Sequence, residues 1–130
     1  MIDKIAFLYP KDGMILSSRN EGKDVWYIPG GKREPGETDL DTLIREVREE
    51  LAVDVIPGTE KLFGVFMSDA HGKASGVKIR MTCYTADFTG TLSASSEVEE
   101  IRFMTTDDMD IISPVDRLIF ADLQRRGYIR

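Results

Sequence analysis

The amino-acid sequence predicts an α/β domain in which a mixed β-sheet is flanked by helices. Short apolar segments rich in β-branched and aromatic residues alternate with turns that contain glycine and proline, a pattern typical of strands. Two longer segments, 38–51 and 113–126, carry the start signals of helices. The 130 residues, 42% hydrophobic and 31% charged, have the length and composition of one globular domain. Because the chain has no repeat and no long linker, residues 1–130 are expected to form a single domain.

The first part of the chain predicts three short strands. Residues 2–8 form an apolar, strand-like run, and a Lys-Asp-Gly turn at 11–13 connects this run to residues 14–16 as a hairpin. Residues 25–28 predict a further short strand, which ends in the Pro-Gly-Gly sequence at 29–31. A loop follows before the first helix.

Residues 38–51 predict the clearest helix. Thr38 is a suitable N-cap, and Asp41 follows at the spacing of a capping box. At about 100° per residue, one face of this helix is apolar and is expected to pack on the sheet. Its members are Leu40, Leu43, Ile44, Val47 and Leu51.

The rest of the chain predicts three more strands and a second helix. The strands are expected at 61–67, 77–88 and 101–104, with a turn at 54–60 and a polar loop at 68–76 that contains His71. Ser113 and Pro114 form a helix start, and the helix is expected to end near Arg126.

Composition and charge exclude several classes of function. The 17 basic and 23 acidic residues give a net charge of -6, which disfavours binding to nucleic acid or to an anionic membrane. No apolar run is long enough to cross a bilayer and no secretory leader is present, so a cytoplasmic location is expected. One Cys and one His exclude an internal disulfide and a Cys/His zinc site. A bound metal is therefore expected to be a hard cation on carboxylate oxygens, Mg²⁺ or Mn²⁺.

The first helix carries an unusual concentration of acid. Glu46, Glu49 and Glu50 lie at positions i, i+3 and i+4, so their side chains are neighbours. They also lie near the helix C-terminus, where the helix dipole disfavours anions. The simple interpretation is a solvated acidic face relieved by Arg45 and Arg48. The alternative is a site in which a divalent cation bridges the carboxylates and leaves coordination positions for phosphate oxygens and water.

The spacing around these acids resembles the Nudix box. From Gly31, five residues precede Glu37, seven more precede Arg45-Glu46-Val47, and after one further residue each come Glu49-Glu50 and Ala52-Val53. The family pattern has Gly where this chain has Ala52. A Gly at a helix end takes the left-handed conformation, which Ala adopts at a cost of roughly 1 kcal/mol.

The resemblance implies a Nudix-type α/β/α sandwich with a mixed β-sheet. It also implies that the three glutamates of the run bind Mg²⁺ (or Mn²⁺) together with the backbone carbonyl of Gly31, and that one of these carboxylates acts instead as the catalytic base. Glu37 and Arg45 would form a structural pair that holds the glycine loop on the helix.

Family members often supply one more acid from a loop before a late strand. Glu97 is the candidate for this catalytic and metal-binding role, with Glu99 and Glu100 as competitors, and the alternative is an ordinary charged loop. Arg19 resembles the phosphate-contacting arginine of many members, and Lys32 is a second candidate for substrate binding. For Arg19 the equal alternative is an ordinary exposed arginine, and Lys32 is the weaker of the two candidates.

The implied activity is hydrolysis of a nucleoside triphosphate, modified or oxidised nucleotides included, to a monophosphate and pyrophosphate. The segment 25–32 resembles the MutT-like branch, although Ile112 stands where an asparagine can read a guanine-type base. Alternatives are hydrolysis of a nucleotide sugar or dinucleoside polyphosphate, and a non-catalytic nucleotide-sensing module. The expected partner is a small nucleotide, and the chain is expected to be a monomer or homodimer.

Overall fold

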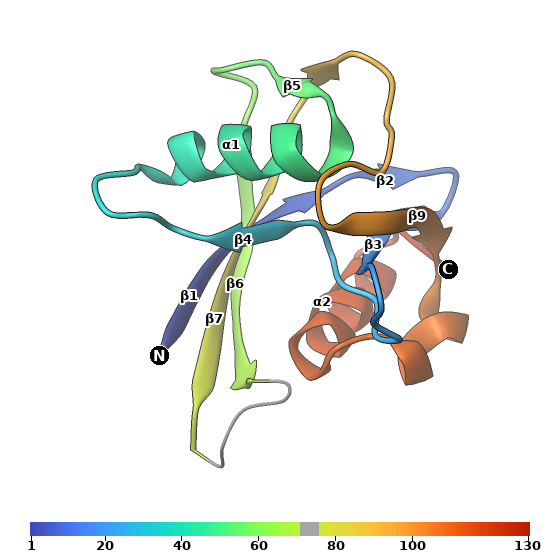
Figure 1. Cartoon of the computed structure of the whole chain (residues 1–130). Helices are drawn as coiled ribbons and strands as arrows, with labels where there is room; N and C mark the ends of the chain where they lie inside the picture. The colour runs from blue at the N-terminus through green and yellow to red at the C-terminus, as the bar shows by residue number, and fades with distance from the viewer. Residues whose placement is uncertain (71–75) are drawn as a thin grey trace.

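The computed structural model describes residues 1–70 and 76–130 (Figure 1). Its elements are β1 (Ile2–Leu8), β2 (Pro10–Lys11), β3 (Met14–Asn20), β4 (Gly30–Lys32), α1 (Asp39–Leu51), β5 (Asp54–Val55), β6 (Lys61–Asp69), β7 (Lys78–Thr85), β8 (Phe88–Thr89), β9 (Val98–Met104), the 3₁₀ helix η1 (Thr106–Ile111) and α2 (Pro114–Arg125). The predicted α/β class is confirmed.

The largest sheet has four strands in the order β4-β1-β7-β6. β1 pairs in parallel with β7 and antiparallel with β4, while β6 is antiparallel to β7, so the sheet is mixed as predicted. A second sheet has the order β2-β3-β9, and β5 pairs with β8. β4 and β7, which are far apart in the sequence, therefore both lie beside β1.

The central strand β1 separates two hydrophobic cores. Successive side chains of a strand point to opposite faces. Ile5 and Phe7 pack with the buried side chains of α1, whereas Ala6 and Leu8 pack with those of α2. The predicted α/β/α sandwich is therefore confirmed, with one helix on each face.

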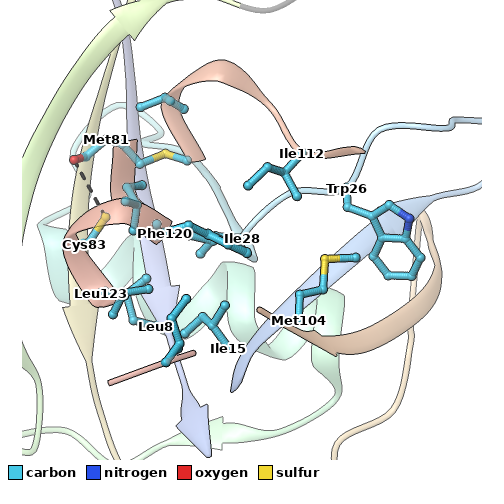
Figure 2. Close-up of a cluster of buried hydrophobic side chains, with 14 of the residues drawn as sticks. Leu8, Ile15, Trp26, Ile28, Met81, Cys83, Met104, Ile112, Phe120 and Leu123 are labelled. Atoms are coloured by element: carbon cyan, nitrogen blue, oxygen red, sulfur yellow. Dashed lines mark hydrogen bonds between the residues drawn. The ribbon is translucent and has the colours of Figure 1, made fainter. Parts of the chain in front are cut away.

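The core beneath α2 also holds the segment that precedes the glycine loop. Figure 2 shows Phe120 of α2 beside Ile28, and Trp26 close to Ile112 and Met104. The Ile112 side chain is buried in this cluster. Ile112 therefore contributes to the core beneath α2.

The prediction of a continuous strand at 25–28 is wrong. Tyr27 exchanges backbone hydrogen bonds with Ser18, while the Trp26 N–H donates to the carbonyl of Ile111. Adjacent residues thus bond to different elements, so only isolated bridges form. The regular strand in this region is β4, which begins at Gly30.

The predicted strands in the second half need three corrections. The expected strand 77–88 ends at Thr85, because Ile56 N–H bonds to the carbonyl of Asp87 and the chain then pairs with β5 as β8. β6 continues beyond its predicted end to Asp69. β9 begins at Val98 rather than at 101, since its first residues pair with the end of β3.

Both ends of α1 follow the sequence prediction. The Thr38 hydroxyl accepts a hydrogen bond from the Asp41 N–H at 3.1 Å, and the Asp41 carboxylate accepts one from the Thr38 N–H at 3.1 Å. At the other end, Ala52 adopts the left-handed conformation with φ 58° and ψ 30°, and its N–H donates to the carbonyl of Arg48. The turn expected from a glycine is therefore present, with Ala in it.

We expect Ala52→Gly to stabilise the protein. The left-handed conformation costs a non-glycine residue about 1–2 kcal/mol, and the greater freedom of glycine in the unfolded chain offsets about 0.4–1 kcal/mol of the gain. Since the Ala52 side chain is exposed, the net increase in the free energy of unfolding should be about 0.5–1 kcal/mol. Urea unfolding measures this change. Ala121→Gly, inside α2, is the control and should destabilise by about 1 kcal/mol; equal destabilisation by both variants would contradict the explanation.

Candidate functional site

Two glycines allow β4 to lie against both β1 and α1. A Cβ atom on Gly30 would lie 2.1 Å from the Ile5 carbonyl oxygen, and one on Gly31 would lie 2.4 Å from the carboxyl carbon of Glu46. The contact with the β1 backbone leaves no room for a side chain on Gly30, whereas a side chain on Gly31 would require the Glu46 carboxylate to move. The Gly-Gly pair therefore brings bare backbone against the acidic face of α1.

Glu50 is the most perturbed of the three helix acids. Its Oε1 accepts a hydrogen bond from the Gly30 N–H at 3.0 Å. Burial raises the pKa of Glu50 to about 8, and the negative charges of Glu46 and Glu49 act in the same direction, against the Gly30 N–H and Lys4. A carboxylate in these surroundings gains from a nearby positive charge.

Glu46 and Glu49 share one cation, the guanidinium of Arg45. The Arg45 Nη1 lies 2.7 Å from Oε1 of Glu46 and 3.6 Å from Oε2 of Glu49. The Glu46 side chain is only 14% exposed, whereas that of Glu49 is 52% exposed. Burial raises the pKa of Glu46 despite its bond to Arg45. The negative charge of this face is thus only partly compensated by the protein.

The same arginine binds Glu37. The Arg45 Nε donates to Oε2 of Glu37 at 2.7 Å and Nη2 donates to Oε1 at 2.9 Å, while Nη2 also donates to the carbonyl of Lys32 at 3.0 Å. The Glu34 N–H and the Thr42 hydroxyl donate to the same carboxylate. The pair predicted from the sequence therefore ties the loop after β4 to α1.

The loop before β9 runs along the C-terminal end of α1. The Ser93 N–H donates to the carbonyl of Leu51 and the Ser95 N–H donates to that of Glu50. Glu97, at the end of this loop, is exposed and takes part in no ion pair among the described residues. The Glu97 carbonyl accepts a hydrogen bond from the Glu21 N–H, so Ser93 and Ser95 are the residues of this loop that bond to the helix end.

Arg19 holds the two competitors of Glu97. Its Nη2 lies 2.6 Å from Oε1 of Glu99 and 3.3 Å from Oε1 of Glu100, and its Nη1 donates to the carbonyl of Lys23. Both glutamates lie in β9 rather than in the predicted loop. The structure therefore engages Arg19 in ion pairs with the protein itself.

Two cavities lie near the candidate site, and the larger one reaches Glu50 of the acidic face. The larger, of about 570 Å³, reaches from Glu50 and Gly30 to Asn20 and Lys23. The smaller, of about 270 Å³, is lined by Lys32 and by the start of α2. Lys4 and Tyr27 line both cavities. Lys4 is not among the site residues predicted from the sequence, although a charged residue inside the apolar run 2–8 is a signal of a special role.

A second residue that the sequence analysis missed is Asp116 of α2. Its Oδ2 accepts a hydrogen bond from the Ile28 N–H at 2.9 Å. Its Oδ1 is buried and has no hydrogen-bond partner within the described ranges 1–70 and 76–130. Burial raises the pKa of Asp116 to about 7. This carboxyl anchors the segment before the Gly-Gly pair to α2.

Comparison with known proteins assigns the fold to a family. The family model described as the NUDIX domain matches residues 4–123. The chain belongs to the NUDIX family. Members of this family are phosphoanhydride hydrolases, so the NUDIX chain is an enzyme of this class. The motif around Glu46 lies inside the matched region.

Individual relatives of this NUDIX chain agree with the assignment. The CTP pyrophosphohydrolase of Escherichia coli is 33% identical over 99 residues, which cover 72% of this chain and 69% of the relative. The solution structure of the E. coli ORF135 protein superposes with a TM-score of 0.74 at 28% identity, covering 98% of this chain and 93% of that one. A MutT protein from Bacillus halodurans has the same fold, with a TM-score of 0.70 at 23% identity over 93% of this chain and 80% of its own. These findings confirm the MutT-like Nudix resemblance.

Four further predictions from the sequence concern metal binding, membrane helices, Cys83 and His71. Within the described residues, no three His, Cys, Asp or Glu side chains are grouped closely enough to hold a metal ion as they stand. No described helix is long and apolar enough to cross a membrane. Cys83 is buried, and burial raises the pKa of its thiol. His71 lies outside the described residues.

We expect the bond between Glu37 and Arg45 to make folding stability depend on pH. Hydrogen bonds from Arg45 lower the pKa of Glu37 from 4.5 to about 2. A carboxyl with a depressed folded-state pKa stabilises the fold above its unfolded pKa and loses this contribution as pH falls through the folded value. The stability lost in Glu37→Gln should therefore be largest near neutral pH and shrink between pH 4.5 and 2.

Urea unfolding of both proteins across that pH range measures the difference. Glu21→Gln, which removes an exposed glutamate outside the motif, is the matched control. A deficit in Glu37→Gln that stays constant down to the lowest pH would show that the ion pair does not stabilise the loop.

Proposed function

We propose that this NUDIX enzyme is a metal-dependent pyrophosphohydrolase that cleaves a nucleoside triphosphate to a monophosphate and pyrophosphate. The observation that carries the proposal is the Glu50 carboxylate, which accepts a hydrogen bond from the Gly30 N–H and lines a cavity of about 570 Å³. Glu46 of the same helix lies against Gly31. A buried, undercompensated acidic face beside a cavity is suited to a cation that in turn attracts phosphate oxygens.

Carboxylate and backbone carbonyl oxygens are the donor types that a hard divalent cation prefers, although the three glutamates would have to move closer together to share one ion. Burial raises the pKa of both Glu46 and Glu50, so the ionised form of each is less favoured here than in water and would gain from an added cation. We propose that these two acids, Glu49 and the carbonyl of Gly31 bind Mg²⁺ or Mn²⁺, with Glu97 as a further ligand or catalytic acid. When bound, the ion supplies positive charge that offsets the charge of the phosphate chain.

The residues of the chain itself orient the reaction. The Gly30 N–H holds the Glu50 carboxylate, and Arg45 holds Glu46. We propose that one of the three glutamates accepts a proton from the attacking water, since general bases must lie within hydrogen-bond reach. The water oxygen forms a bond to one of the two phosphorus atoms of the α–β bridge. The bond from that phosphorus to the bridging oxygen breaks, and the monophosphate and pyrophosphate separate.

CTP is the triphosphate to test first. A relative that is 33% identical over 72% of this chain is a CTP pyrophosphohydrolase. The smaller cavity, lined by Tyr27 and the start of α2, shares Lys4 and Tyr27 with the larger cavity and offers room for a nucleobase. We propose that Arg19 and Lys32 contact the substrate, which for Arg19 requires exchange of Glu99 and Glu100 for phosphate oxygens.

We expect Mg²⁺-dependent turnover of one triphosphate to be lost in Glu49→Gln. The panel comprises CTP, other triphosphates, oxidised nucleotides, nucleotide sugars and dinucleoside polyphosphates, with products separated by chromatography. The variant should lose at least about 100-fold in kcat, the effect of removing one preorganised electrostatic group. Asp110→Asn, which removes an exposed acid of η1, should retain activity.

The panel also tests the alternative activities. Preferred cleavage of a nucleotide sugar or dinucleoside polyphosphate would replace the triphosphate proposal. Tight binding of a nucleotide with no product over hours would instead favour a sensing module.

We expect Gly31→Ala to reduce turnover by at least about 10-fold, because the added methyl displaces the Glu46 carboxylate. The control is Gly36→Ala, which meets nothing within 4 Å but has φ +82°. The control should lose stability and keep its activity. Comparison of thermal unfolding with kcat separates the two effects, and normal turnover in Gly31→Ala would argue against a role of Glu46.

A further inference from the structure

Two lysines face one another across the pair of strands β1 and β4. Lys4 and Lys32 are direct Cα partners in this antiparallel pairing. Opposite residues of antiparallel strands project to the same face of the sheet. Both side chains line the smaller cavity, in agreement with the register.

Folding alone gives no reason for this arrangement. Like charges directly opposite each other in a sheet are destabilising. Burial lowers the pKa of the Lys4 ammonium, and the charge of Lys32 lowers it further, against the opposing charges of Asp116, Glu50 and Glu46. The charged form of Lys4 is thus less favoured in the folded chain than in water.

The carboxylates that attract the Lys4 ammonium, those of Asp116, Glu50 and Glu46, are not in contact with it. Among the described residues, no carboxylate lies within ion-pair distance of its ammonium and no hydrogen bond to it is formed. The Lys4 Nζ lies over the Tyr27 ring, 5.9 Å from its centroid. An ammonium group has three N–H donors, so Lys4 can still bind acceptors from a ligand.

Lys4 lies between the candidate active site and the smaller cavity. Lys4 lines both cavities, and the larger one also contains Glu50 and Gly30. A ligand that extends from the acidic face into the smaller cavity therefore passes the Lys4 ammonium. Phosphate oxygens are strong acceptors for such a point charge.

We infer that Lys4 and Lys32 together form an anion-binding site that holds the phosphate chain of the nucleotide. This inference rests on the proposed function and adds Lys4 as a substrate-binding residue. The two ammonium groups donate to phosphate oxygens, and the ligand relieves the repulsion between the cations.

The test compares wild type with Lys4→Met, Lys32→Met and the control Lys11→Met. Lys11 is an exposed lysine of β2, so its loss changes the net charge equally. Calorimetry with α,β-methylene-CTP, which is not cleaved between its α- and β-phosphates, measures binding in Mg²⁺. We expect a roughly 10-fold weaker Kd for Lys4→Met, as for loss of a charge-assisted hydrogen bond, a smaller loss for the more exposed Lys32, and no loss for the control.

Two further readouts separate binding from a structural role. The deficit of Lys4→Met should shrink between about 50 and about 500 mM NaCl, because salt screens interactions between charges. Its Tm should equal or exceed that of wild type, because a methionine there removes repulsion and desolvation. In the hydrolysis assay KM should rise about 10-fold with little change in kcat, as for an interaction made equally in ground and transition states.

The outcomes are distinct for the two proposals. Unchanged analogue binding together with a lower Tm in Lys4→Met would show that Lys4 is only a counter-ion for Asp116 and would overturn the inference. No binding of the analogue by wild type would also overturn it. If wild type binds the analogue through Lys4 but hydrolyses no triphosphate, the proposed function fails and the anion site stands.

Discussion

The close approach of the Gly30–Gly31 backbone to β1 and α1 is the constraint on which the site depends. A side chain on Gly30 would overlap the carbonyl of Ile5, and one on Gly31 would overlap the Glu46 carboxylate. Because both Cβ atoms are missing, the Gly30 N–H reaches Glu50. A central strand, a loop and a helix thereby meet at one place without intervening side chains.

Electrostatic strain accompanies this packing. Glu46 and Glu50 are drawn into a partly buried position, where burial raises the pKa of each. Arg45 offsets part of the charge and also ties Glu37 to the helix. The structure can hold such a face because apolar side chains of α1 and β1 pack directly beneath it, and burial of apolar surface is the dominant favourable term in folding. The crowded acids of α1 destabilise the helix, and burial of its apolar face offsets this cost.

The second helix shapes the cavities from the other face of the sheet. Asp116 accepts a hydrogen bond from Ile28, two residues before Gly30, so α2 positions the entry to the glycine loop. Lys4 lies on the strand between these features and lines both cavities. The candidate substrate site is therefore a product of the sandwich, because its walls come from both helices and from the strand between them.

The sequence by itself determined the class of fold, the limits of α1 and its capping box, the motif acids and the pairing of Glu37 with Arg45. These features depend on local periodicity, caps and spacing within one loop and helix, and they survive in the structure because tertiary packing agrees with them. Only the tertiary structure decided how the strands divide between sheets, that Glu99 and Glu100 bind Arg19, and that Lys4 faces Lys32. Strand register and a buried contact such as that of Asp116 with Ile28 join residues far apart in the chain. No local pattern records such pairs, because they arise from the packing of both helices on the shared central strand.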